Sequence, residues 1–127
     1  MYEDTSDKFT VMRCAVNPTG DKLYITDILH RRLLTLARNG SVLATFTDPA
    51  LKQPGDVHVT PAGQVLVYWS MPSTILQVDS EGKRKLATLA TKEDGLVKPW
   101  SVCYNRHTAS ILVGLYANSS IMVFRVQ

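Results

Sequence analysis

The sequence predicts an all-β fold, a partial β-propeller of about three four-stranded antiparallel blades with the last blade incomplete. Three observations support this prediction. The chain repeats itself three times with a period of about 43 residues. Each repeat contains short runs of β-branched and aromatic residues separated by turn residues. No stretch combines a helical period with a capping residue, so almost no helix is expected.

The repeats are visible as pairs of matching segments. The first reads MRCAVNPTGDKLYITD and RRLLTLARNGSVLATF, the second GDVHVTPAGQVLVYWS and TILQVDSEGKRKLATLA, and the third WSVCYNRHTASILVGLY and SSIMVFRVQ. Pro18–Gly20 matches Pro61–Gly63, and Asn39-Gly40 matches Glu81-Gly82. After a polar segment 1–10, we expect blades over residues 11–50, 54–92 and 98–127.

Strands are expected where alternating apolar residues lie between these turns. The expected ranges are 12–17, 22–27, 31–37 and 41–47 in the first blade; 55–60, 64–69, 74–79 and 83–90 in the second; and 100–104, 109–116 and 120–126 in the third. Each blade is apolar on both faces and therefore needs a neighbour on each side, so three blades leave two outer faces open.

Composition is that of an ordinary globular protein of 127 residues, with 45% hydrophobic residues and a net charge of +3. No run approaches the roughly 20 apolar residues that span a bilayer. The acidic N-terminus is unlike a secretory signal peptide, so we expect a cytoplasmic location. Cys14 and Cys103 lie within apolar runs without metal-ligand spacing, and we expect both to be buried, reduced thiols. No cofactor and no metal are expected.

The segment Asp27-x-x-His30-x-Arg32-Leu33, placed between two predicted strands, resembles the NHL repeat. Residues 54–63, PGDVHVTPAG, supply the front half of that motif in the second unit, and residues 98–102 begin the third similarly. The second and third units depart from the pattern, with Trp69 and Thr74 in the second, and Leu115 and Ser120 in the third, at the places of Asp27 and Arg32.

The resemblance implies a six-bladed propeller of the type found at the C-terminus of tripartite-motif (TRIM) proteins. It implies that this chain is the C-terminal part of a larger propeller, which either the missing half or a second copy would complete. It also implies that Asp27 and Arg32 form a structural pair bracing a turn, which leaves Arg31 freer to contact a ligand.

We expect a non-catalytic module that binds a protein or single-stranded RNA through the loops between the second and third strands of each blade and between blades. Basic side chains beside aromatic rings suit RNA, because phosphates need cations and bases stack on rings. In the TRIM setting the module would recruit targets for ubiquitin transfer by other domains. The candidate binding residues are Arg31, Arg32, Lys52, Trp69, Lys98, Trp100 and Tyr116.

An alternative is a metal-dependent hydrolase resembling six-bladed lactonases. Asp56 and His58 alternate with Val57 and Val59 on one strand, so both polar side chains point to the same side and could line the propeller channel. The sequence contains no nucleophile elbow, phosphate-binding loop, zinc-protease motif or dinucleotide fingerprint. The binding module therefore remains the first hypothesis.

Overall fold

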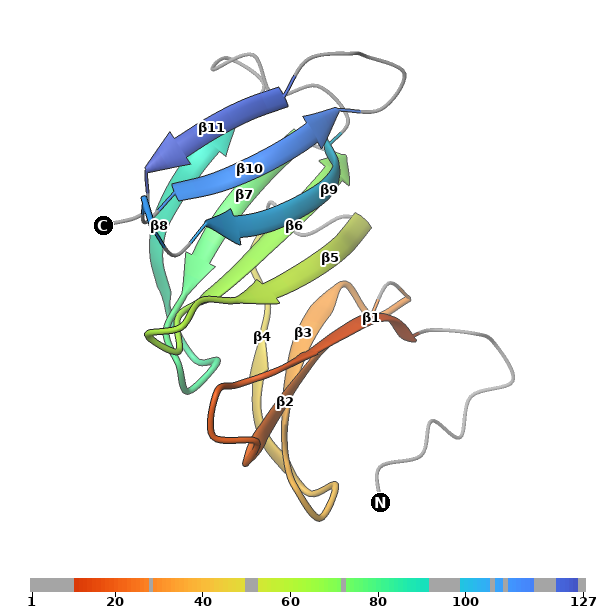
Figure 1. Cartoon of the computed structure of the whole chain (residues 1–127). Helices are drawn as coiled ribbons and strands as arrows, with labels where there is room; N and C mark the ends of the chain where they lie inside the picture. The colour runs from red at the N-terminus through yellow and green to blue at the C-terminus, as the bar shows by residue number, and fades with distance from the viewer. Residues whose placement is uncertain are drawn as a thin grey trace.

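The computed structural model describes residues 11–27, 29–49, 53–71, 73–91, 99–105, 107–108, 110–115 and 121–125. These residues form eleven strands in three separate antiparallel sheets and contain no helix. Within these ranges no helix has the length and apolar character needed to cross a membrane. The three sheets lie one after another along the chain (Figure 1), as blades of a partial β-propeller.

Each sheet is a meander of sequential strands. The first contains β1 (Val11–Val16), β2 (Lys22–Asp27), β3 (Arg32–Ala37) and β4 (Val42–Phe46). The second contains β5 (Gln53–Val59), β6 (Val65–Met71), β7 (Ser73–Val78) and β8 (Lys85–Thr91). The third contains β9 (Pro99–Asn105), β10 (Ser110–Leu115) and β11 (Ile121–Arg125). All eleven coincide with predicted strands, with ends shifted by at most two residues.

The first strands of the three sheets, β1, β5 and β9, lie side by side on one side of the molecule (Figure 1). Since each sheet is antiparallel, the β1–β2, β3–β4, β5–β6 and β7–β8 turns lie at one end of the sheets. The β2–β3 and β6–β7 connections lie at the other. We call these the hairpin end and the loop end.

The first and second sheets share the largest apolar cluster. Tyr24, Leu33 and Phe46 of the first sheet pack there against five valine and leucine side chains of the second. The second and third sheets share another cluster, in which Leu66, Tyr68 and Ile75 meet Ile111 and Val113. Because the second sheet contributes to both clusters, it is covered on both faces, as alternating strands require.

The prediction that Cys14 and Cys103 are buried is wrong, because both side chains are exposed. Cys14 pairs across β1 and β2 with Ile25, on the face of the first sheet away from the second. Cys103 pairs with Leu112 on the corresponding outer face of the third sheet. Cys14 lies in β1 and Cys103 in β9, each at the edge of its sheet, so strands do not enclose either thiol on both sides.

Candidate functional site

The β2–β3 connection at the loop end is built around one buried carboxylate. Asp27 is only 2% exposed, and its Oδ1 accepts a hydrogen bond from the His30 backbone amide at 3.2 Å. Its Oδ2 lies 2.9 Å from His30 Nδ1 and 3.0 Å from Arg32 Nε. The carboxylate therefore holds both sides of the connection, and the Asp27–Arg32 pair expected from the sequence is present as an ion pair.

Leu29, His30 and Arg31 form the turn between these fixed points and are exposed. Arg31 has φ of 54°, which makes it the one non-glycine residue with a left-handed backbone among the described residues. Such a conformation costs an L-amino acid about 1–2 kcal/mol and persists only where its surroundings impose it. Leu29 is 46% exposed, and the His30 side chain is exposed to the same extent. We call Leu29, His30 and Arg31 the β2–β3 knob.

The second sheet closes the equivalent connection differently. Trp69 pairs with Thr74 in β6 and β7, as Asp27 pairs with Arg32 in β2 and β3. In the second sheet the backbone ladder then continues to Ser70 and Ser73. Of these two connections, the one in the first sheet is braced by a carboxylate, and the one in the second sheet follows a strand ladder that extends one register pair further.

The side chains of the other five predicted binding residues are not described by the structure. Trp69 lies in β6 and Trp100 in β9, and the structure describes their backbone positions. Lys52, Lys98 and Tyr116 lie outside the described residues. Of the seven candidates, the structure therefore describes the side chains of Arg31 and Arg32, which lie in the same connection. The proposed rim of basic and aromatic side chains stays a prediction.

A hollow of about 610 Å³ lies at the hairpin end, where the first strands of all three sheets finish. Ligand pockets commonly have volumes of about 300–1,000 Å³. Its lining is mostly apolar with a few polar and imidazole groups: Val16, Pro18, His58, Val59, Thr60, Pro61, Tyr104, Asn105, His107 and Leu112. The hollow lies at the opposite end from the predicted binding face.

His58 is central to this hollow. Its ring stacks on Tyr104 of the third sheet, with centroids 6.3 Å apart and planes 29° from parallel. Burial lowers the pKa of His58 below its ordinary 6.5, and the nearby Asp56 carboxylate opposes that effect. The imidazole is therefore neutral at pH 7, and it acts here as a packed ring.

The sequence predicted on which face of its strand His58 lies, but it did not predict the contact of His58 with Tyr104. The alternation of Val57, His58 and Val59 already placed His58 opposite the valines, and the valines do pack against the first sheet. Tyr104 and His107 could not be assigned to the same place, because their approach depends on how the third sheet stacks on the second. Asp56 Oδ1 accepts a hydrogen bond from the Val57 amide at 2.9 Å. Within the ranges described above, no three His, Cys, Asp or Glu side chains are grouped to hold a metal ion.

No protein-family model matches the chain, and no curated protein matches it. Solved structures do resemble it in fold. A candidate 6-phosphogluconolactonase from Bacteroides fragilis matches with a TM-score of 0.77 and 13% identity, over 92% of this chain and 35% of that one. A chain of the nidogen/laminin complex matches with a TM-score of 0.72 and 15% identity, over 89% of this chain and 42% of that one.

Streptogramin B lyase matches with a TM-score of 0.69 and 11% identity, over 96% of this chain and 42% of that one. The chain thus spans 35–42% of the length of these three structures. Identities this low establish the fold alone. The chain is similar to β-propeller proteins and has the fold of part of one.

Proposed function

We propose that the chain is a non-catalytic binding module, part of an NHL-type propeller, that recognises an acidic segment of a protein partner through the β2–β3 knob. The observation that carries this proposal is the backbone of Arg31. Arg31 is a left-handed arginine in an exposed turn, and its neighbours His30 and Arg32 both contact the buried Asp27 carboxylate, so the backbone that carries its guanidinium is held in place. A guanidinium recognises carboxylates through two parallel hydrogen bonds.

The composition of the knob favours a protein over RNA. Arg31 stands beside Leu29, whose exposed apolar side chain suits the apolar residues that flank a carboxylate on a protein surface. RNA recognition would draw on Lys52, Lys98 and the aromatic rim, whose side chains the structure does not describe. In a longer protein of TRIM type, this module would select targets for ubiquitin transfer by other domains. The hydrolase alternative is not carried forward, since the contacts of Asp56 and His58 do not specifically favour it.

A displayed library of short random peptides tests this proposal. Selection on the whole chain should enrich peptides with Asp or Glu beside an apolar residue. Their affinity should fall about tenfold in Arg31→Glu, because a hydrogen bond to a charged group is worth about 1.5–3 kcal/mol. Arg84→Glu makes the same charge change in the exposed β7–β8 turn at the hairpin end and is the matched control.

Two outcomes would contradict the proposal. Selected peptides that bind Arg31→Glu as tightly as the unchanged chain would remove the knob from recognition. Single-stranded oligouridine that binds tightly at low salt, weakens steeply as salt rises and is lost in Arg31→Glu would show phosphate contacts instead. Circular dichroism should show the same sheet content in both variants, because both side chains are exposed.

A further inference from the structure

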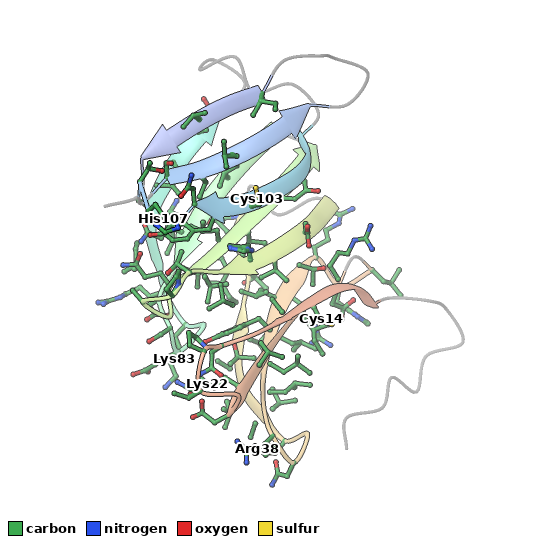
Figure 2. All side chains as sticks on the ribbon, viewed as in Figure 1. Cys14, Lys22, Arg38, Lys83, Cys103 and His107 are labelled. Carbon is green, nitrogen blue, oxygen red and sulfur yellow. The ribbon has the colours of Figure 1, made fainter. Side chains whose placement is uncertain are left out.

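The hollow of about 610 Å³ at the hairpin end is lined by residues of all three sheets. The first sheet and its β1–β2 turn supply Val16 and Pro18, the second sheet supplies residues 58–61, and the third supplies Tyr104, Asn105, His107 and Leu112. Figure 2 shows the hairpin ends of the first and third sheets on the same side of the molecule, marked by Lys22 and His107. The β2–β3 knob lies at the opposite end, so what this hollow binds does not depend on the function proposed for the knob.

Two turns of the same kind form part of the rim of the hollow. In each, a glycine amide donates to the carbonyl three residues earlier, at 3.0 Å in the β1–β2 turn and at 2.8 Å in the β5–β6 turn. Pro18 and Pro61 take the second place in these turns, where the fixed φ of proline is favoured. This part of the lining is therefore apolar and held in shape before any ligand binds.

The rings of His58 and Tyr104 form another part of the lining. They come from β5 and β9 and stack with centroids 6.3 Å apart, a separation at which aromatic rings attract one another. Both side chains are half-buried and both line the hollow, so part of this ring pair is accessible from it. A flat aromatic ligand in the hollow can therefore pack against the pair.

The same part of the lining carries groups that can form hydrogen bonds to a ligand. Among the described residues, none forms a hydrogen bond with the ring nitrogens of His58 or with Tyr104 Oη. Asn105 Oδ1 accepts a hydrogen bond from the His107 backbone amide at 3.0 Å, which leaves the Asn105 Nδ2 group to donate. A carbonyl or amide group on a ligand can therefore find partners here.

The described lining of the hollow carries no formal charge at pH 7. No Asp, Glu, Lys or Arg is among the described residues that line it. His58 is neutral at this pH, because burial lowers its pKa below the ordinary 6.5. A charged ligand would lose hydration here without gaining an oppositely charged partner, which is costly. The lining therefore favours an uncharged ligand over an anion or a cation of the same shape.

We propose that the hollow binds a small, flat, uncharged aromatic molecule that carries a carbonyl or amide group. Small-molecule pockets have volumes of about 300–1,000 Å³ and combine apolar walls with a few polar groups, as this hollow does. A ligand that fills the hollow contacts all three sheets at once. Because it binds the folded chain and not the unfolded one, it also stabilises the stacking of the sheets.

Titration of the whole chain with 2-naphthamide tests the proposal. This neutral bicyclic amide should bind with a dissociation constant below about 1 mM, measured by ligand-detected NMR. 2-Naphthoate has nearly the same shape but carries a negative charge, and at pH 8 it should bind at least about tenfold more weakly. The urea concentration at the midpoint of unfolding should rise with 2-naphthamide and change less with an equal concentration of 2-naphthoate.

A pair of variants in the β5–β6 turn locates the site. Pro61→Trp puts a large side chain at the rim of the hollow and should weaken the binding of 2-naphthamide by at least about tenfold, because the ring occupies the ligand's space. Ala62→Trp makes the same replacement one residue later in the same exposed turn, outside the lining, and should leave binding unchanged. Pro18→Trp should repeat the loss from the β1–β2 turn, which keeps the test valid if one variant misfolds.

Three results would overturn the proposal. The first is the absence of 2-naphthamide binding up to the limit of its solubility. The second is binding of 2-naphthoate as tight as that of 2-naphthamide at pH 8, which would mean that the hollow does not select against charge. The third is equal binding by Pro61→Trp, Pro18→Trp and Ala62→Trp with circular dichroism unchanged, which would place the ligand elsewhere on the chain.

Discussion

The two interfaces between sheets use the same positions with different chemistry. Between the first and second sheets, polar contacts supplement the apolar cluster. Tyr24 Oη donates to the Ser80 carbonyl at 2.5 Å, Thr26 Oγ1 donates to the Gly55 carbonyl at 3.0 Å, and Lys85 pairs with Asp48 at 3.5 Å. Between the second and third sheets, the described contacts are an apolar cluster and the stack of His58 on Tyr104.

This difference shows how a degenerate repeat keeps its fold. Leu66, Tyr68 and Ile75 face the third sheet from the places where Tyr24, Thr26 and Leu33 face the second. The requirement at each place is a side chain that fills the space between sheets, and hydrogen bonds are optional. The first interface should therefore be sensitive to single polar changes, whereas the second should respond mainly to loss of apolar volume.

The largest effect is expected at Gly82, in the β7–β8 turn that covers the first sheet. Gly82 has φ of 73°, and a methyl group added there would overlap Thr35 Oγ1 of β3. Gly82→Ala should lower the free energy of unfolding by about 3 kcal/mol, from overpacking and left-handed strain together. Urea unfolding followed by tryptophan fluorescence measures this loss.

Gly63→Ala is the matched control for Gly82→Ala. Gly63 has a similar φ of 87°, but no atom lies within 4 Å of the added methyl group. Only the left-handed strain remains, so the loss should be about 1 kcal/mol. Equal losses in the two variants would show that the β7–β8 turn does not press on the first sheet.

These contacts mark the limit of what the sequence predicted. The strands and turns were predictable because apolar alternation and glycine-containing turns are local signals, and all eleven strands were found. The contact of Gly82 with Thr35 depends on how one sheet rests on the next, and no local pattern reports that. The error at Cys14 and Cys103 has the same origin: alternation says which residues share a face, but not which of them stay exposed at the edge of a sheet.

The next largest effect is expected at Thr26, which is fully buried. Its hydroxyl accepts a hydrogen bond from the Arg13 amide at 3.0 Å while donating to the Gly55 carbonyl. Thr26→Val keeps the shape but leaves both backbone groups without these bonds. The free energy of unfolding should fall by about 2 kcal/mol, the cost of unsatisfied buried polar groups. A loss far smaller than about 2 kcal/mol would show that a water molecule takes over the hydrogen bonds of the hydroxyl.

Thr35 should respond to the same substitution with the opposite sign. It is also fully buried and also faces the second sheet, yet its Oγ1 has no hydrogen-bond partner among the described residues. Thr35→Val removes a polar group that is desolvated without compensation. The free energy of unfolding should rise by about 1 kcal/mol. The comparison with Thr26→Val in one urea series isolates the hydrogen bonds, since volume and location are closely matched.

The smallest effect is expected at the second interface, and it depends on pH. The pKa of His58 is lowered on folding, so near pH 6.5 the unfolded chain binds more protons than the folded chain. Its contribution is therefore fully present above pH 6.5 and declines as the pH falls through the folded pKa. His58→Phe keeps a ring against Tyr104 and removes the titration. Between about pH 7 and pH 5 the variant should lose less stability than the unchanged protein, by under ~1 kcal/mol.

This pH series also separates His58 from the other histidines. His30 and His107 are the same in the two proteins, so the difference between the two curves reports on His58 alone. If stability depends on pH in the same way in His58→Phe and in the unchanged protein, folding does not change the protonation of His58. The second interface is then open to water beside Tyr104. If they diverge on acidification, the ring is desolvated between the sheets, and the apolar character of the second interface extends to its one histidine.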